Sequence, residues 1–270
     1  MSALALCALV GGYCLIVLGI GLFQRRLIYF PTKLSPESAE RAAANAAFLP
    51  WRDKSGQLIG WRLPASSPPG GNVLIAHGNA GCALDRAYLA LPIHQAASLD
   101  VYILEYPGYG TRAGSPDQTS FFAAADDALE DLPANLPVYL VSESLGAGVV
   151  AHLAQKHPAR VAGLALFAPY DNLASVAQGH MPFLPAGLLL RDRFDPASDL
   201  KNYRGPIKFI IAAADEVIPP KFGQRLYDGY SGPKTLQIIP GARHNDIEEQ
   251  SPDWWRGVLA FWRQHAVISM

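Results

Sequence analysis

The sequence predicts an α/β fold with a mostly parallel sheet of about eight strands, flanked by helices and preceded by one N-terminal transmembrane helix. From residue 73 onward, short continuous apolar runs alternate with segments of helical length. Strands of a parallel sheet that is covered by helices on both faces have such runs. Two strand-like runs joined by a turn come before this region, and an uncharged apolar stretch opens the chain. These three observations predict the layered architecture and its anchor.

The alternating region supplies most of the predicted elements. The apolar runs read as strands are Val73–Ala76, Val101–Leu104, Val138–Val141, Val161–Phe167, Ile207–Ala212 and Leu236–Ile239. The segments read as helices are Leu84–Ala97, Asp117–Leu132, Leu145–Lys156, Pro219–Tyr230 and Ile247–His265. Before them, Ala47–Trp51 and Leu58–Leu63 predict an antiparallel pair at the edge of the sheet.

The first apolar stretch has the length of a membrane span. Residues 3–23 carry no charge, and these 21 residues would form a helix of about 32 Å, close to the ~30 Å hydrocarbon core. A cleaved signal peptide is the alternative, with 19–21 as a small-residue cleavage site. No Lys or Arg precedes the stretch, however, and it is longer than a usual signal-peptide core. We therefore predict a single-pass membrane anchor at residues 1–24. Because Arg25 and Arg26 follow it, the positive-inside rule favours a cytoplasmic face for the domain.

Composition supports one folded domain at residues 25–270. Half of the 270 residues are hydrophobic, which suits a large core. The net charge of −1 without a basic run argues against nucleic acid as a partner. The histidines show no metal-ligand spacing, so we expect no metal site. Residues 171–199 form an extra stretch that does not belong to the alternation of strands and helices. They predict a small insertion that could form a lid.

A serine follows the third of these apolar runs at a turn. In open α/β sheets, ligands bind at the carboxyl ends of the strands. The sequence Ser142-Glu143-Ser144-Leu145-Gly146 comes directly after such a run and before an apolar helix. It matches a nucleophile elbow with Ser144 as the nucleophile, although Ser142 stands where glycine is usual. The alternative is an ordinary helix cap in which the Ser144 side chain accepts a backbone N–H.

An acid and a histidine follow the next strand ends. Asp215 comes after the run at 207–212, and His244 comes after the run at 236–239. The chain order Ser144, Asp215, His244 is that of the α/β-hydrolase triad. His244 would take the serine proton, and Asp215 would hold the imidazole tautomer. Other carboxylates that could serve as the acid are Glu216, Asp246 and Asp171.

An oxyanion site is also expected. One donor is the backbone N–H of Leu145, the residue after the nucleophile. The second donor should come from the loop at 77–81, whose sequence is His-Gly-Asn-Ala-Gly, and we assign it to the N–H of Asn79. Nearby, Cys82 is read as a buried, inert thiol. Tyr106 and Tyr109 are read as packing residues more than as pocket walls.

Taken together, these residues resemble the α/β-hydrolase superfamily, and within it the membrane-anchored, bud-emergence-protein-like branch of abhydrolase-domain proteins. The resemblance rests on the anchor with its following Leu-Ile-Tyr-Phe-Pro sequence, the loop at 77–81, the Glu-Tyr-Pro-Gly-Tyr-Gly sequence at 105–110 and the sequences around the three proposed triad residues. The insertion sequence at 191–195 also fits this branch. The resemblance implies a serine hydrolase that acts on an ester, thioester or amide and needs no cofactor.

The resulting functional prediction is a membrane-tethered serine hydrolase that cleaves carboxylic ester or thioester bonds through an acyl-enzyme. Its substrate would be a small-molecule or lipid-like ester, or an acylated protein. One alternative is an inactive membrane-bound binding protein, and another is a peptidase or acyltransferase on the same fold. Met181, Phe183 and Leu184 would either form an acyl pocket or pack the insertion.

Overall fold

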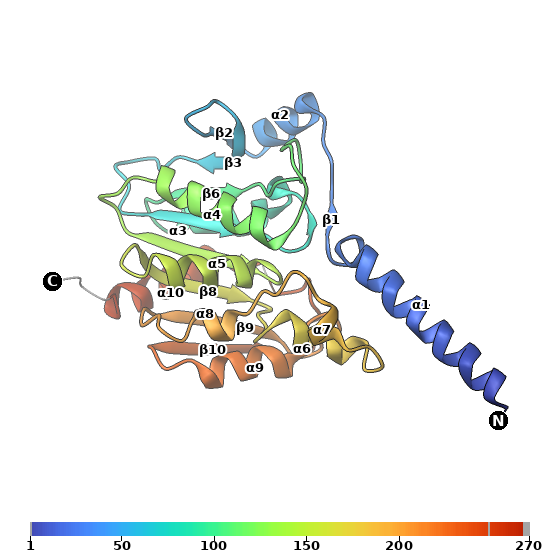
Figure 1. The fold of residues 1–270 in the computed structure, drawn as a ribbon. Coiled ribbons are helices and arrows are strands. Elements are labelled where there is room, and N and C mark those ends of the chain that lie inside the picture. The colour runs from blue at the N-terminus through green and yellow to red at the C-terminus, as the bar shows by residue number, and fades with distance from the viewer. Residues whose placement is uncertain (1, 248, 267–270) are drawn as a thin grey trace.

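The computed structural model describes residues 2–247 and 249–266 and contains a central eight-stranded sheet (Figure 1). Its strand order is β10-β9-β8-β7-β4-β6-β3-β2. In that order the strands are Lys234–Ile239, Ile207–Ala212, Val161–Phe167, Val138–Glu143, Asn72–Ala76, Asp100–Leu104, Leu58–Leu63 and Leu49–Arg52. Pairing is parallel from β10 to β6, and β3 and β2 are added antiparallel. The predicted α/β sheet is confirmed.

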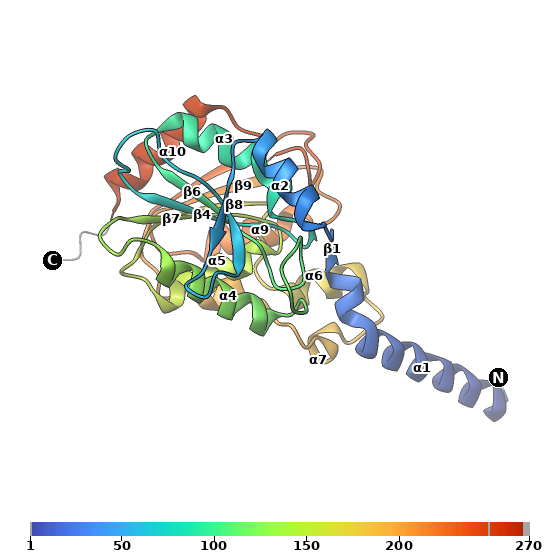
Figure 2. The ribbon, with the colours of Figure 1, turned by 90° about the horizontal axis from the view of Figure 1, so that it is seen from above.

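Helices cover both faces of the sheet (Figure 2). On one face lie α2 (Pro36–Asn45), α3 (Ala87–Ala96) with the short helix η1 (Ala83–Arg86), and α10 (Pro252–Gln264). On the other face lie α4 (Gln118–Asp131), α5 (Gly146–Lys156), α9 (Pro220–Gly229) and α8 (Pro196–Asp199). A two-stranded parallel ribbon joins β1 (Phe30–Pro31) to β5 (Ala80–Gly81).

The core consists of two apolar layers separated by the sheet. Leu74 and Leu140 belong to one buried layer, whereas their neighbours Ile75 and Val141 belong to the other. Successive strand residues point to opposite faces, so a strand that is covered on both faces needs apolar residues at every position. This explains why the central strands appear in the sequence as continuous apolar runs.

The N-terminal helix α1 (Ala3–Ile28) projects away from the body of the molecule (Figure 1). It is long and apolar enough to cross a membrane, and its most apolar window is not buried against the rest of the chain. It therefore fits a membrane anchor. The helix continues four residues past residue 24, and this last turn reaches the domain.

Several element boundaries differ from those predicted. The last helix starts at Pro252 and not at Ile247, because the Ser251 side chain caps it and Pro252 occupies its first turn. Strand β2 starts at Leu49 and not at Ala47, since Ala47 has a left-handed backbone with φ of 59°. The insertion at 171–199 is helical, with α6 (Leu173–His180), α7 (Ala186–Leu189) and α8.

Candidate active site

Ser144 lies on a sharp turn between β7 and α5. Its φ of 48° places it in the left-handed region, which is sparsely populated by side chains other than glycine. A Cβ on Gly146 would collide with the carbonyl oxygen of Ala76, so only glycine lets α5 start this close to β4. Ser142 lies inside β7 without a positive φ, so this position does not require the backbone freedom of glycine.

The three residues predicted as a triad come together at this turn. His244 Nε2 lies 3.1 Å from Ser144 Oγ, and His244 Nδ1 lies 2.7 Å from Asp215 Oδ2. All three residues are buried. The other carboxylate oxygen of Asp215 accepts the backbone N–H groups of Val217 and Ile218 at 2.8 and 2.7 Å. The carboxylate is thus oriented by the backbone on one side while its second oxygen faces the imidazole.

The other carboxylates considered as the triad acid make different contacts or face solvent. Asp246 accepts the N–H of Arg243 in its own loop at 2.9 Å. Asp171 is paired with Arg225 at 2.7 Å, and Glu216 is exposed to solvent. Among the carboxylates considered from the sequence, Asp215 is therefore the one that this geometry places against the histidine.

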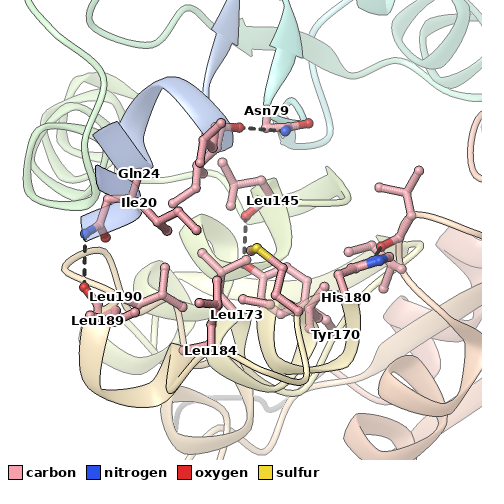
Figure 3. Close-up of a pocket in the computed structure, with 18 of the residues that line it drawn as sticks. Ile20, Gln24, Asn79, Leu145, Tyr170, Leu173, His180, Leu184, Leu189 and Leu190 are labelled. Carbon is pink, nitrogen blue, oxygen red and sulfur yellow. Dashed lines mark hydrogen bonds between the residues drawn. The ribbon is translucent and has the colours of Figure 1, made fainter. Parts of the chain in front are cut away.

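Ser144 borders a pocket of about 300 Å³. Figure 3 shows most of the residues that line this pocket. The pocket lies between α1, the insertion and the ends of the strands. Most of its lining is apolar, and the lining comprises Ile20, Gln24, Leu27, Ile28, Asn79, Ser144, Leu145, Tyr170, Leu173, Val176, Ala177, His180, Met181, Leu184, Ala186, Leu189, Leu190, Val217 and Ile218. Met181 and Leu184 thus belong to the pocket, whereas Phe183 points outward and is exposed. Tyr106 and Tyr109 are buried in the core.

Asn79 and Leu145 line the same pocket as Ser144. The side chain of Asn79 donates to the carbonyl of Ile28 at 2.7 Å, which ties the loop to the end of α1 (Figure 3). The Asn79 carbonyl accepts both the Phe30 N–H at 2.9 Å and the Tyr109 hydroxyl at 2.7 Å. Across residues 2–247 and 249–266, no backbone acceptor takes the N–H of Asn79 or that of Leu145.

Comparison with known proteins assigns the family. A family model described as "Serine aminopeptidase, S33" matches residues 67–191. An uncharacterized protein of Mycobacterium tuberculosis is 34% identical over 234 residues, covering 83% of this chain and 82% of that protein. Protein bem46 of Schizosaccharomyces pombe is 26% identical over 251 residues, covering 83% and 81%. The chain belongs to the α/β-hydrolase superfamily.

The fold of this α/β hydrolase is also that of solved members. The crystal structure of Paleococcus ferrophilus monoacylglycerol lipase has a TM-score of 0.58 and 20% sequence identity to the chain. The match covers 77% of this chain and all of the lipase chain. At this identity the likeness shows the fold alone. The sequence relatives and the solved structure therefore agree on the α/β-hydrolase fold.

Beneath the elbow, the hydrolase has a buried ion pair that sequence reasoning missed. Glu143 accepts the N–H of Gly78 at 3.0 Å and the Nε–H of Arg86 at 2.8 Å, and Tyr88 donates to its other oxygen. Arg86 in turn donates to the carbonyl of Ala80 at 3.0 Å. Burial opposes ionisation of Glu143, but the charge of Arg86 and these hydrogen bonds hold the pKa of Glu143 below its usual value. The pair therefore fixes the loop that carries Asn79.

The Cys82 thiol is buried beside this loop. Burial, together with the nearby carboxylates of Glu105 and Asp85, raises the pKa of the Cys82 thiol to about 12. The prediction that this thiol is buried is confirmed, and a raised pKa disfavours the reactive thiolate. In the described parts of the chain, no group of three or more His, Cys, Asp or Glu side chains could hold a metal ion.

Proposed function

We propose that the chain is a membrane-tethered serine hydrolase that cleaves carboxylic ester or thioester bonds through an acyl-enzyme. The observation that carries the proposal is the pair of hydrogen bonds from Ser144 through His244 to Asp215. A serine hydroxyl needs such a base to become a nucleophile at neutral pH. The serine side chain also borders a pocket where a substrate can bind.

The reaction follows from these contacts. His244 Nε2 takes the proton as Ser144 Oγ attacks the carbonyl carbon, and Asp215 stabilises the imidazolium that forms. The oxyanion of the tetrahedral intermediate accepts the N–H groups of Leu145 and Asn79. His244 then gives its proton to the leaving alcohol or thiol. Water, activated by the same histidine, cleaves the acyl-enzyme and restores Ser144.

The apolar pocket supports a lipid-like ester as substrate, either a small molecule or the acyl group of an acylated protein. Its lining contains no Asp, Glu, Lys or Arg side chain among the described residues. An aminopeptidase would need a carboxylate to bind the free amino group of its substrate. Despite the name of the matching family model, this pocket therefore favours ester over peptide hydrolysis.

We also propose that α1 spans the membrane and that the domain faces the cytoplasm. The apolar stretch of α1 is followed by Gln24, Arg25 and Arg26, so two cationic side chains lie at its domain end. The positive-inside rule favours this orientation. Protection of the domain from protease added outside intact cells would support it, and cleavage of the domain under these conditions would contradict it.

The proposed activity is tested with the full-length protein in detergent micelles on p-nitrophenyl esters from acetate to palmitate. We expect hydrolysis that prefers longer acyl chains and falls by a factor on the order of 10⁴–10⁶ in Ser144→Ala. Ser142→Ala is the matched control, because the buried Ser142 hydroxyl has no hydrogen-bond partner among the residues that the structure describes. Equal activity of Ser144→Ala and the natural protein would contradict the proposal. Inactivity of both proteins would instead support the binding-protein alternative.

A further inference from the structure

A second apolar segment lies beside α1. Residues 181–190, within the insertion, contain no polar side chain. Near one end of this segment, the hydroxyl of Tyr13 donates to the carbonyl of Phe183 at 2.9 Å. Near the other end, Gln24 Nε2 donates to the carbonyl of Leu189 at 3.0 Å (Figure 3). The segment therefore follows the C-terminal half of the anchor.

These contacts give the depth of the segment. Residues 13 to 23 of a helix rise by about 15 Å, which is half of the ~30 Å hydrocarbon core. If α1 spans a bilayer, the segment at 181–190 lies at the depth of the leaflet nearest to the domain. It would be surrounded there by acyl chains.

The apolar part of α1 and the segment at 181–190 are followed by charged residues at the same depth. The apolar part of α1 ends at Gln24 and Arg25, and the second segment ends at Arg191 and Asp192. Gln24 Oε1 accepts the N–H of Arg191 at 2.7 Å, and Arg25 pairs with Asp192 at 3.0 Å. Charged side chains that meet where two apolar segments end are expected at a membrane–water boundary.

The surface and backbone of the segment also suit a bilayer. The side chains of Phe183 and Leu188 are 86% and 83% exposed, next to the exposed apolar residues of α1. Exposed backbone polar groups are costly in hydrocarbon. Pro182 and Pro185 have no N–H, and the Gln178 side chain donates to the carbonyls of Met181 and Pro182. Contacts with Tyr13 and Gln24 satisfy two further carbonyls.

We propose that residues 181–190 insert into the leaflet beside α1, and that the pocket between them receives its acyl chain from that leaflet. The substrate is then a long-chain fatty acyl ester of a lipid dissolved in the same membrane. This step rests on the proposed hydrolase function. The anchor supplies one wall of the pocket and the inserted segment supplies the facing wall, with Ser144 on its border; the wall residues are Ile20, Leu27, Ile28, Met181, Leu184 and Leu189.

Insertion is tested without any activity measurement. Cys7 and Cys14 of the full chain are changed to Ser, and Leu188→Cys is labelled with an environment-sensitive NBD fluorophore in phosphatidylcholine vesicles. We expect blue-shifted emission and quenching by doxyl-labelled phosphatidylcholine. A probe at exposed Lys54→Cys, on the far β2–β3 turn, should show neither effect. Water-like emission at position 188 would overturn the inference.

Delivery of the acyl chain from the leaflet is tested by a substitution in the part of the pocket wall that α1 contributes. In vesicles, Ile20→Trp should lower the ratio of long-chain lipid ester hydrolysis to p-nitrophenyl acetate hydrolysis by about tenfold or more, because the indole fills part of the apolar pocket. Leu15→Trp is the control, since Leu15 is exposed on α1 outside the pocket. An unchanged ratio in Ile20→Trp would contradict the proposed entry.

The failures of the two proposals are distinguishable. If Ser144 reacts with a fluorophosphonate while the probe at position 188 stays in water, only the membrane insertion of residues 181–190 is overturned. An unreactive Ser144 together with a lipid-buried probe would overturn the hydrolase function and, with it, the substrate named here.

Discussion

The acid of the proposed triad is held by the backbone as well as by its partner. One carboxylate oxygen of Asp215 accepts two backbone N–H groups, and the other faces His244 Nδ1. This arrangement leaves the second oxygen free to accept the imidazole N–H and so to direct Nε2 toward Ser144. The Asp215 carboxylate therefore helps to hold the position and the tautomer of the base.

The first prediction concerns this side chain. Asp215→Asn should lower kcat by about 10⁴-fold, because an amide can donate to Nδ1 and stabilise the wrong tautomer of the histidine. The measurement is steady-state hydrolysis of a p-nitrophenyl ester by the full-length protein. Glu216→Gln and Asp246→Asn serve as controls and should keep most of the activity. A larger loss in either control than in Asp215→Asn would reassign the acid.

The second prediction concerns the ion pair beneath the elbow. Arg86→Met should lower the free energy of unfolding by about 3–5 kcal/mol near neutral pH, because it leaves the Glu143 carboxylate buried without its cation. In the natural protein the pKa of Glu143 is lowered, so its contribution is present above the unfolded pKa of about 4.3 and is lost as pH falls through the folded pKa. The difference between the two proteins should therefore shrink at acid pH.

Denaturant unfolding in detergent at several pH values measures this difference. The double variant Arg86→Met with Glu143→Gln should recover part of the lost stability, because position 143 then carries no charge that lacks its partner. A stability difference that is the same at acid and neutral pH would show that packing, and not charge, explains the effect of Arg86→Met.

The residues of the site differ in how well the sequence predicts them. Ser144, Asp215 and His244 each follow an apolar run, so the strand pattern alone placed them at one edge of the sheet. Glu143 and Arg86 are 57 positions apart, and no periodicity links them. Their pairing depends on where the fold places η1 relative to the end of β7, which is tertiary information.

At the scale of elements, the start of α5 determines where the nucleophile points. Gly146→Ala should destabilise the protein and lower activity, because the added Cβ meets the carbonyl oxygens of Ala76 and His77. Overpacking of this kind typically costs 1–3 kcal/mol, and we expect about that loss or more. Thermal melting and ester hydrolysis measure the two effects.

Gly257→Ala in α10 is the matched control. Within the described parts of the chain, a Cβ at Gly257 meets no atom within 4 Å, and alanine is the better helix former by roughly 0.5–1 kcal/mol. This control should melt at the same or a higher temperature with unchanged activity. If both variants behaved alike, close packing of α5 against β4 would not explain the glycine.

Element boundaries show where the pattern of apolar residues is an incomplete guide. The central strands were predicted nearly to the residue, because burial on both faces produces unbroken apolar runs. The start of α10 was placed five residues early, since apolar Ile247 extended the pattern. The capping residue Ser251 and the following Pro252 were the signals that mark the true start.

At the scale of the whole molecule, the anchor and the hydrolase domain share one pocket. The sequence predicted α1 as a tether and the insertion as a lid, but it contained no sign that the two lie side by side. Ile20 and Gln24 line the pocket with Met181 and Leu184. A protein without residues 1–24 would lack part of this wall, so activity should be measured on the full-length chain.

The hydrolase function is tested most directly by covalent capture of its nucleophile. Full-length protein in phospholipid nanodiscs would be treated with a fluorophosphonate, digested and analysed by mass spectrometry. We expect one adduct on the peptide that contains Ser144, and no adduct in Ser144→Ala. A natural protein that stays unmodified at Ser144, or that reacts equally well after Ser144→Ala, would contradict a serine hydrolase built on Ser144, His244 and Asp215.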